Sequence, residues 1–340
     1  MRERSLDPLL TKLLRGTDLT LSESRTFFRQ LFAGALPLTK AKSFLLLLAK
    51  KGETADELLG CLRALQALEK PIGPRIPGLM DTCGTGGDGR QTINISTLVA
   101  LVIAGAGGKI AKHGNRAISS RSGSSDLMEA FGVKLDAAPR KMIAAIQRSG
   151  LGYFHAPFFH PVFAQIQPLR KLLKRPTILN LLGPLVNPMR LDHQLVGVSE
   201  KHRVPLYAKV LSKLGRKTAL VCHSHDGMDE ISTSGPTTVA WVTPGEIRMA
   251  VIRPGIYGLR KASLKHLSVD SVAKSKLRAQ KILTGKEKGP ARDVVVLNAA
   301  FGLLLCGKAA SVEEGITLAQ KSLDSGKALK VLKQLKAMAH

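Results

Sequence analysis

The sequence predicts an α/β protein in which a small N-terminal helical domain precedes a larger α/β domain with a mostly parallel central sheet. Apolar residues recur at helical spacing through the first 70 residues, whereas beyond residue 78 short apolar runs alternate with helical patterns. Such alternation is typical of strands and helices arranged around a parallel sheet. At 340 residues the chain is long enough for two domains.

The first 70 residues are expected to fold as helices. Leucines fall on one helical face over 6–14, and a second apolar face covers 27–32. Thr20 and Thr54 each precede a Glu by three residues, which is the capping-box spacing of a helix start. Two helices are therefore predicted to begin at these threonines.

A stretch rich in Pro and Gly, 71–78, can continue neither helix nor strand. We interpret it as a hinge between the helical domain, 1–70, and the α/β domain, 79–340. Strands are predicted over 108–111, 218–223 and 238–242, and helices over 96–106, 124–131, 140–149 and 204–214. Ligand chemistry is expected in loops at the carboxyl ends of the strands.

The charge balance is unusual, with 51 Lys and Arg against 25 Asp and Glu and a net charge of +26. Such a field attracts polyanions and anionic substrates alike. The basic residues are spread along the chain, without the long run that is typical of a disordered nucleic-acid arm. Only 4% of residues are aromatic, which argues against a stacking platform for single-stranded nucleic acid. Weak, sequence-independent binding to nucleic acid is still expected from the charge.

Four isolated cysteines show no metal-ligand or redox spacing, so we expect reduced thiols. The longest apolar run, near 98–106, is too short to span a bilayer. The N-terminal residues form a mixed amphipathic stretch and do not resemble a signal peptide. We therefore expect a cytoplasmic protein without a membrane partner.

The most informative motif is a glycine-rich stretch, 81–89, with the sequence DTCGTGGDG. Closely spaced glycines let backbone amides approach an anion. The polar residues 94–97 follow and begin an apolar helix, whose free amides and dipole favour phosphate. The stretch fits neither a Walker loop nor a dinucleotide fingerprint. It predicts an anion site, with a plain glycine turn before a capped helix as the alternative.

A second polar loop, 112–120, follows the strand predicted to end near Ala111 and leads into the helix at Ser124. Lys112 and Arg116 offer cationic donors for phosphate, and the serines offer hydroxyls. The alternative is a polar surface turn with Ser124 as the N-cap. Two phosphate-type loops so close together favour the anion site.

Asp229 and Glu230 follow the strand predicted over 218–223. Adjacent carboxylates at a strand end suit magnesium, which prefers oxygen ligands and is shared with substrate phosphates. Acidic turns are common, but this chain has few acids and two loops whose anion would need neutralising. Arg170 follows several aromatic residues and could bind the carboxylate of a small aromatic acid, although taken alone it suits a surface position.

Together these segments resemble the anthranilate phosphoribosyltransferase family, which makes phosphoribosylanthranilate on the route to tryptophan. The resemblance is carried by residues 84–88, 94–97, 112–116 with Ser119 and Ser120, 183–188, and the pair Asp229 and Glu230. Further matches at 16–20, 51–54, 297–300 and 324–328 extend it almost from end to end. The resemblance implies a fold of the nucleoside phosphorylase/phosphoribosyltransferase class and a homodimer formed through the helical parts.

The resemblance also implies roles for individual residues. Phosphoribosyl pyrophosphate would be bound by Gly84, Gly87, Asp88, Thr92, Asn94, Ile95, Ser96, Thr97, Lys112, His113, Gly114, Asn115, Arg116, Ala117, Ile118, Ser119, Ser120 and Ser124. Anthranilate would meet Gly84, Asn115 and Arg170, and two magnesium ions would be held by Ser96, Asp229 and Glu230. No residue is assigned as a general base, because the aromatic amine is a neutral nucleophile.

One segment departs from the family pattern. The family usually has Gly-Gly-Asp followed by Glu-Asn-Ala, whereas this chain has LSVDSVAK over 267–274. The segment lies outside the ligand positions above, but it leaves room for a weakened enzyme or for a paralogue with another acceptor.

Two rival functions remain open. A pyrimidine nucleoside phosphorylase-like enzyme would share the fold, but its usual Lys-His-Ser loop and Ser-Gly-Arg-Gly stretch are absent. A basic, non-catalytic nucleic-acid-binding paralogue on the same scaffold would use the net charge. The presence of both phosphate-type loops and of the acidic pair counts against lost catalysis.

Overall fold

The computed structural model describes residues 6–117 and 121–340, which divide into two compact units. Unit 1 comprises Met1–Pro71 and Phe159–Val186, and unit 2 comprises Ile72–Phe158 and Asn187–His340. In this division residues 159–186 fall in unit 1, whereas the predicted α/β domain, 79–340, includes them. Their helices α10 (Gln167–Leu173) and α11 (Ile178–Leu181) pack on α3 (Leu38–Lys51) of that unit.

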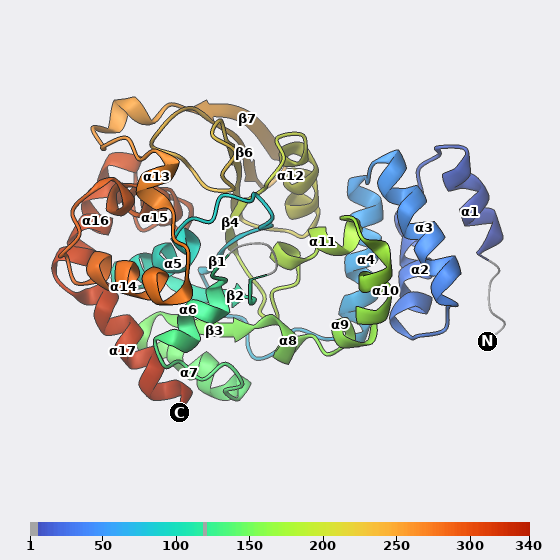
Figure 1. Ribbon diagram of the computed structural model, residues 1–340, viewed down its shortest axis with the longest axis horizontal. Helices are drawn as coiled ribbons and strands as arrows, with labels where there is room; N and C mark the ends of the chain where they lie inside the picture. The colour runs from blue at the N-terminus through green and yellow to red at the C-terminus, as the bar shows by residue number, and fades with distance from the viewer. Residues whose placement is uncertain (1–5, 118–120) are drawn as a thin grey trace. The chain divides into compact units, whose positions relative to one another are not determined.

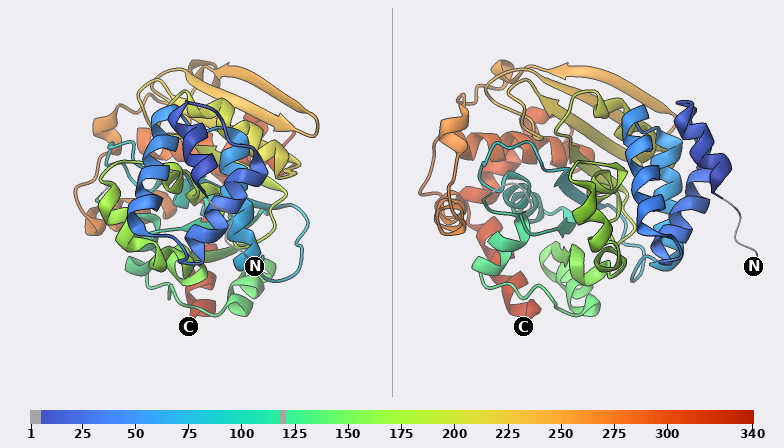
Figure 2. Two further views of the ribbon diagram at one scale, coloured as in Figure 1. Left: turned by 90° about the vertical axis from the view of Figure 1, so that its right-hand side faces the viewer. Right: turned by 45° about the vertical axis from the view of Figure 1, so that its right-hand side comes forward.

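Unit 1 is helical throughout the part that the structure describes. Its helices are α1 (Asp7–Leu14), α2 (Leu21–Phe32), α3 (Leu38–Lys51), α4 (Ala55–Leu68), α9 (Val162–Gln165), α10 (Gln167–Leu173), α11 (Ile178–Leu181) and the 3-10 helix η1 (Gly183–Leu185). Figure 2 shows α1 to α4 lying side by side. Both predicted capping boxes are present, at Thr20 and at Thr54.

Unit 2 is built on one seven-stranded sheet with the order β3-β2-β1-β4-β5-β6-β7. Its strands are β1 (Leu79–Gly84), β2 (Lys109–Gly114), β3 (Leu151–His155), β4 (His193–Gly197), β5 (Thr218–Ser224), β6 (Thr237–Thr243) and β7 (Glu246–Ile252). Strands β1 to β5 pair in parallel, and β6 and β7 continue the sheet in antiparallel fashion. The predicted fold class is confirmed.

Helices cover both faces of this sheet. The described helices of unit 2 are α5 (Ile95–Gly105), α6 (Ser124–Ala130), α7 (Pro139–Ser149), α12 (Arg203–Lys213), α13 (Leu264–Leu267), α14 (Val272–Leu283), α15 (Pro290–Leu305), α16 (Val312–Asp324), α17 (Lys327–Ala339) and the 3-10 helix η2 (Pro254–Tyr257). Helix α8 (Ala156–Phe159) carries the chain from unit 2 into unit 1. Figure 1 shows α12 on one side of the sheet and α5 and α15 on the other. No described helix combines the length and apolar character needed to cross a membrane.

Every strand and helix that the sequence predicts beyond residue 78 is present, displaced by no more than a few residues. Four strands were missed, namely β1, β3, β4 and β7. Strand β2 also extends to Gly114, so Lys112 and His113 are strand residues and not loop residues as predicted. A strand is recognised in a sequence by apolar residues at every second position. Polar residues near the end of a strand therefore obscure its pattern.

Candidate active site

The parallel strands β1, β2, β4 and β5 end at one edge of the sheet, where ligands bind in open sheets of this kind. The glycine-rich loop follows β1, the second polar loop follows β2, and the acidic pair follows β5. A small cavity at this edge is lined by Ser96 from α5 and by Asp229 and Glu230. The structure therefore brings the three predicted metal ligands to one place.

The loop after β1 needs its glycines for two physical reasons. Gly86, Gly87 and Gly89 adopt φ values of 63°, 80° and 69°, a region that strains other residues. At Gly84, the last residue of β1, the reason is space, because an added Cβ would lie 2.1 Å from Oδ2 of Asp229. The amide of Gly86 also donates to that oxygen at 3.0 Å, so the loop is fixed against the acidic pair.

Three carboxylates crowd together at this edge. Asp88, Asp229 and Glu230 each contribute an oxygen to a group whose members all lie within 4.8 Å of one another. Burial, reinforced by the charge of Asp88, raises the pKa of Asp229 to about 6. Burial and the charge of Asp229 raise the pKa of Glu230 well above its usual range.

The donor set fits a hard divalent cation. Oε2 of Glu230 is buried and has no hydrogen-bond partner among the described residues. Burying several carboxylate oxygens without partners costs free energy. The same oxygens are favourable ligands when a divalent cation lies between them. Asp88 was predicted as a substrate residue, and the structure places it within this acidic group as well.

Helix α5 begins with backbone amides that have no side-chain cap. Asn94 occupies the N-cap position, but its side chain makes no capping hydrogen bond. The alternative of a capped helix is therefore not supported at Asn94, because its side chain donates to the Ser122 carbonyl and accepts from the hydroxyls of Ser122 and Ser275 instead. The amide of Ile95 donates to the carbonyl of Ile93 at 2.7 Å, so the amides of Ser96 and Thr97 are the ones that the first turn offers to an anion.

Lys112 and His113 lie in the interior of the sheet. The ammonium of Lys112 donates to the carbonyl of Thr82 at 2.5 Å, and its side chain is buried. The amide of His113 donates to Oδ1 of Asp81 at 3.3 Å. The sequence had placed Lys112 in a loop, with its charge free for phosphate, whereas here the charge is directed at the neighbouring strand.

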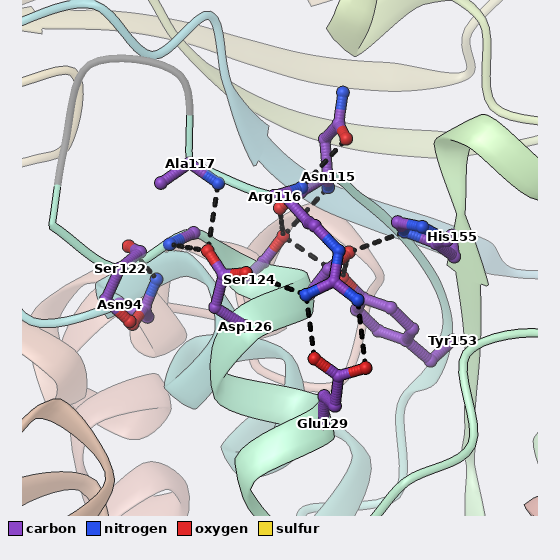
Figure 3. A network of polar contacts seen from close by, with 12 residues as sticks. Asn94, Asn115, Arg116, Ala117, Ser122, Ser124, Asp126, Glu129, Tyr153 and His155 are labelled. Carbon is purple, nitrogen blue, oxygen red and sulfur yellow. Dashed lines mark hydrogen bonds and ion pairs between the residues drawn. The ribbon is translucent and has the colours of Figure 1, made fainter. Parts of the chain in front are cut away.

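The loop after β2 folds around Asp126, as Figure 3 shows. Oδ2 of Asp126 accepts hydrogen bonds from the amides of Ala117 and Gly123, both at 2.9 Å. Gly123 is the N-cap of α6, which corrects the alternative that Ser124 caps this helix. The Ser124 hydroxyl instead accepts from the amide of Asn115 at 3.1 Å, inside the same loop.

Arg116 is held by two carboxylates in this structure. Its guanidinium makes a bidentate contact with Glu129, at 2.7 and 2.9 Å, and a third contact with Asp126 at 3.1 Å (Figure 3). A phosphate that recruits Arg116 would have to compete with these exposed ion pairs, which contribute little each. The predicted site residues Ile118, Ser119 and Ser120 lie outside the described residues.

Gly114 and Thr92 occupy constrained backbone positions at the same edge. A Cβ at Gly114 would lie 2.2 Å from the Tyr153 hydroxyl, so only glycine fits there. Thr92 forms an isolated antiparallel bridge with Ser268. Arg170 lies on α10 of unit 1, half-buried, and burial lowers its pKa.

Two asparagines that the sequence analysis left without a role support the site. Asn298 on α15 bonds both backbone groups of Ile231, the residue after Glu230, at 2.8 and 2.9 Å. Asn187 donates to Oδ2 of Asp81 at 2.9 Å and to the carbonyl of Ala111 at 2.8 Å. A lone Asn inside the apolar helix α15 is the signal that could have revealed the first, because a buried amide needs partners.

Known proteins match the chain along almost its whole length. Residues 7–68 match the helical bundle domain of a glycosyl transferase family, and residues 77–329 match the a/b domain of that family. The anthranilate phosphoribosyltransferase of Desulfitobacterium hafniense is 44% identical over 331 residues, which cover 97% of this chain and 98% of that protein. This chain belongs to the anthranilate phosphoribosyltransferase family.

Solved structures of anthranilate phosphoribosyltransferases share the fold. The crystal structure from Thermus thermophilus superposes with a TM-score of 0.91 at 37% identity and covers 97% of this chain and 98% of that one. The Saccharomyces cerevisiae enzyme in complex with phosphoribosyl pyrophosphate and Mg gives a TM-score of 0.89 at 26% identity, with 100% and 99% coverage. The same yeast enzyme with 4-fluoroanthranilate also gives 0.89 at 26%, with 99% and 98% coverage.

Proposed function

We propose that this chain transfers the phosphoribosyl group of phosphoribosyl pyrophosphate to the amino group of anthranilate. The products are N-(5-phosphoribosyl)anthranilate and pyrophosphate, in tryptophan biosynthesis. The observation that carries the proposal is the meeting of the glycine-rich loop, the uncapped start of α5 and the acidic pair at one sheet edge. Family membership and the yeast complexes support the same substrates.

The polyphosphate part of the substrate would use backbone groups more than side chains. Gly87 and Gly89 are exposed in the loop after β1, and α5 adds the amides of Ser96 and Thr97 in its first turn. The residues assigned above from both loops are proposed as this site, with Asp88 shared between substrate and metal. Arg170 is proposed as the partner of the anthranilate carboxylate, with Asn115 and Gly84 as further contacts.

Ser96, Asp229 and Glu230 would hold magnesium, with Asp88 as an additional oxygen donor. When bound, the metal neutralises the pyrophosphate leaving group. Two ions are proposed, because the family resemblance implies one at Ser96 and a second at Asp229 and Glu230.

The protein's own contribution is orientation and charge. The aromatic amine is a neutral nucleophile, so the chain must hold it near the anomeric carbon, without a strong base. The amides and cations of the two loops stabilise the charge that develops on the departing pyrophosphate. Because these groups are fixed by the sheet edge, little reorganisation is needed when the bond breaks.

We also propose a homodimer that forms through unit 1. Leu14 on α1 and Leu38 on α3 are 70% and 46% exposed, although they are large and apolar. Exposed apolar side chains of this kind are favourable in an interface with a second copy. Analytical ultracentrifugation tests this, and replacement of both leucines by Lys is expected to shift the chain toward monomer.

The proposed reaction is tested by following anthranilate fluorescence with the purified chain. Fluorescence should fall only when phosphoribosyl pyrophosphate and Mg²⁺ are both present. Phosphate-dependent cleavage of uridine or thymidine, with no change in anthranilate, would instead support the nucleoside phosphorylase alternative.

A further inference from the structure

The segment that departs from the family pattern contacts the loop after β1 through its backbone. The carbonyl of Leu267 accepts from the amide of Ile93 at 2.8 Å, and the amide of Val269 donates to the carbonyl of Gln91 at 2.9 Å. Between them, Thr92 and Ser268 form the antiparallel bridge. The link between α13 and α14 thus pairs like a short strand with the residues just before α5.

A buried serine adds a side-chain link to this backbone pairing. The hydroxyl of Ser275, on α14, donates to Oδ1 of Asn94 at 2.8 Å, and Ser275 is 0% exposed. The same Asn94 oxygen accepts from the Ser122 hydroxyl at 3.0 Å, and the Asn94 amide donates to the Ser122 carbonyl at 2.9 Å (Figure 3). Asn94 therefore joins the start of α5, the end of the loop after β2, and α14.

Helix α14, which carries Ser275, has a capped start and a buried inner face. Its N-cap, Ser271, accepts from the amide of Lys274 at 3.3 Å, and its inner face buries Ala279, Ile282 and Leu283. The loop after β1 differs beyond the Gly86–Asp229 contact, because Gly87 and Gly89 have high conformational freedom and the next backbone pairing is at Gln91 to Ile93. Ordering that loop for a ligand costs free energy, and an attachment to a fixed helix lowers the cost.

We infer that Ser275 is a positioning residue for the phosphoribosyl pyrophosphate site. It fixes Asn94, and through Asn94 it fixes the first turn of α5 and the relation of the two polar loops. The inference rests on the proposed function for the identity of the anion. It adds to that function a residue outside every assigned ligand position, and a role for the segment 267–275 in substrate affinity.

The test compares Ser275→Ala with Ser275→Thr and with the control Ser322→Ala. Ser322 is also buried, and its hydroxyl donates to the carbonyl of Val102 at 2.8 Å, near the other end of α5. Loss of one hydrogen bond is expected to raise the KM and Kd for phosphoribosyl pyrophosphate roughly 2- to 12-fold in Ser275→Ala. The KM for anthranilate should stay unchanged, Ser275→Thr should restore most of the affinity, and Ser322→Ala should leave both constants unchanged.

Amide hydrogen exchange gives a second readout that does not depend on turnover. In Ser275→Ala, exchange should accelerate in peptides that cover 91–97, and in Ser322→Ala it should not change there. Wild type that binds phosphoribosyl pyrophosphate but consumes no anthranilate would reject only the proposed reaction. The effect of Ser275→Ala on binding would then be measured by calorimetry, which needs no turnover. Unchanged affinity and exchange in Ser275→Ala would overturn the inference, as would an equal rise in both KM values.

Discussion

Gly84 and Asp229 approach each other so closely that no residue larger than glycine fits at position 84. A Cβ at position 84 would lie 2.1 Å from Oδ2 of Asp229, and one at Gly197 would lie 1.4 Å from the Asp229 carbonyl oxygen. Sequence alone indicated a glycine-rich anion loop and a separate acidic pair. It did not show that Asp229 leaves no room for a side chain at Gly84 or Gly197, because these contacts join segments that are distant in the chain.

The side chains of Asp229 and Glu230 are expected to be essential for turnover and dispensable for the fold. Both point into the candidate metal site, so Asp229→Asn with Glu230→Gln keeps their volume and removes their charge. The double variant should lose turnover and the rise in Tm that Mg²⁺ gives wild type, while its circular dichroism stays native. Near-normal activity at saturating Mg²⁺ would contradict the proposed ligands.

Replacement of Arg170 is expected to weaken the binding of anthranilate but not that of phosphoribosyl pyrophosphate. Loss of a charge-assisted hydrogen bond to a carboxylate costs roughly 1.5–3 kcal/mol, so Arg170→Ala should raise the KM for anthranilate about ten- to a hundredfold. The KM for phosphoribosyl pyrophosphate should change little. Arg175→Ala, an exposed arginine of the same unit, serves as the control. Equal constants in wild type and Arg170→Ala would assign Arg170 to the surface.

At the scale of elements, the sequence predicted helices better than strands. Thr20 and Thr54 mark helix starts through local hydrogen bonds, which a sequence pattern contains in full. Strand β1 ends in polar residues and could not be separated from its loop, since its partners β2 and β4 are distant in sequence. The contact of 267–269 with 91–93 was equally hidden, although the departure from the family pattern pointed to that segment.

Asp192, just before β4, bonds to residues that immediately precede the neighbouring strands β1 and β5. Its negative charge is expected to stabilise unit 2. Burial alone would raise its pKa, but hydrogen bonds from Arg75, the Gly78 amide and Lys217 outweigh burial and lower the pKa to about 2. A lowered pKa stabilises the fold above the ordinary value of 3.8, and the contribution is lost as pH falls through about 2.

Asp192→Asn should therefore reduce the free energy of unfolding at pH 7 by on the order of 1–2 kcal/mol, a figure kept small because Arg75 and Lys217 are solvent-exposed. The difference from wild type should shrink as pH falls from 4 toward 2. Urea unfolding at pH 7, 4 and 3 measures it. A difference that stays constant over this range would show that the charge of Asp192 is not the cause.

At the scale of the whole molecule, the net charge of +26 sets the behaviour toward polyanions. Lys274 and Arg278 on α14 are paired with Asp270 and Glu287. In the described chain, no ion pair engages the remaining lysines of this region, namely Lys276, Lys281, Lys286 and Lys288. We propose weak, sequence-independent binding to nucleic acid, carried in part by these lysines.

DNA retention should fall steeply with salt and show no base preference, because phosphate contacts release counterions and read no sequence. Replacing Lys281, Lys286 and Lys288 by Gln should weaken retention more than the same change at Lys327, Lys330 and Lys333 on α17. Anthranilate turnover should be indifferent to added DNA. Binding that survives high salt, or DNA that activates turnover, would make nucleic acid a functional partner.

The proposed transfer of the phosphoribosyl group to anthranilate has a fixed stoichiometry, and product analysis tests it most directly. The purified chain is incubated with anthranilate, phosphoribosyl pyrophosphate and Mg²⁺, and all products are quantified by chromatography and mass spectrometry. We expect one N-(5-phosphoribosyl)anthranilate and one pyrophosphate for each anthranilate consumed, and none from the Asp229→Asn, Glu230→Gln variant. Absence of the phosphoribosylated product from a folded wild-type chain that binds phosphoribosyl pyrophosphate would contradict the claim.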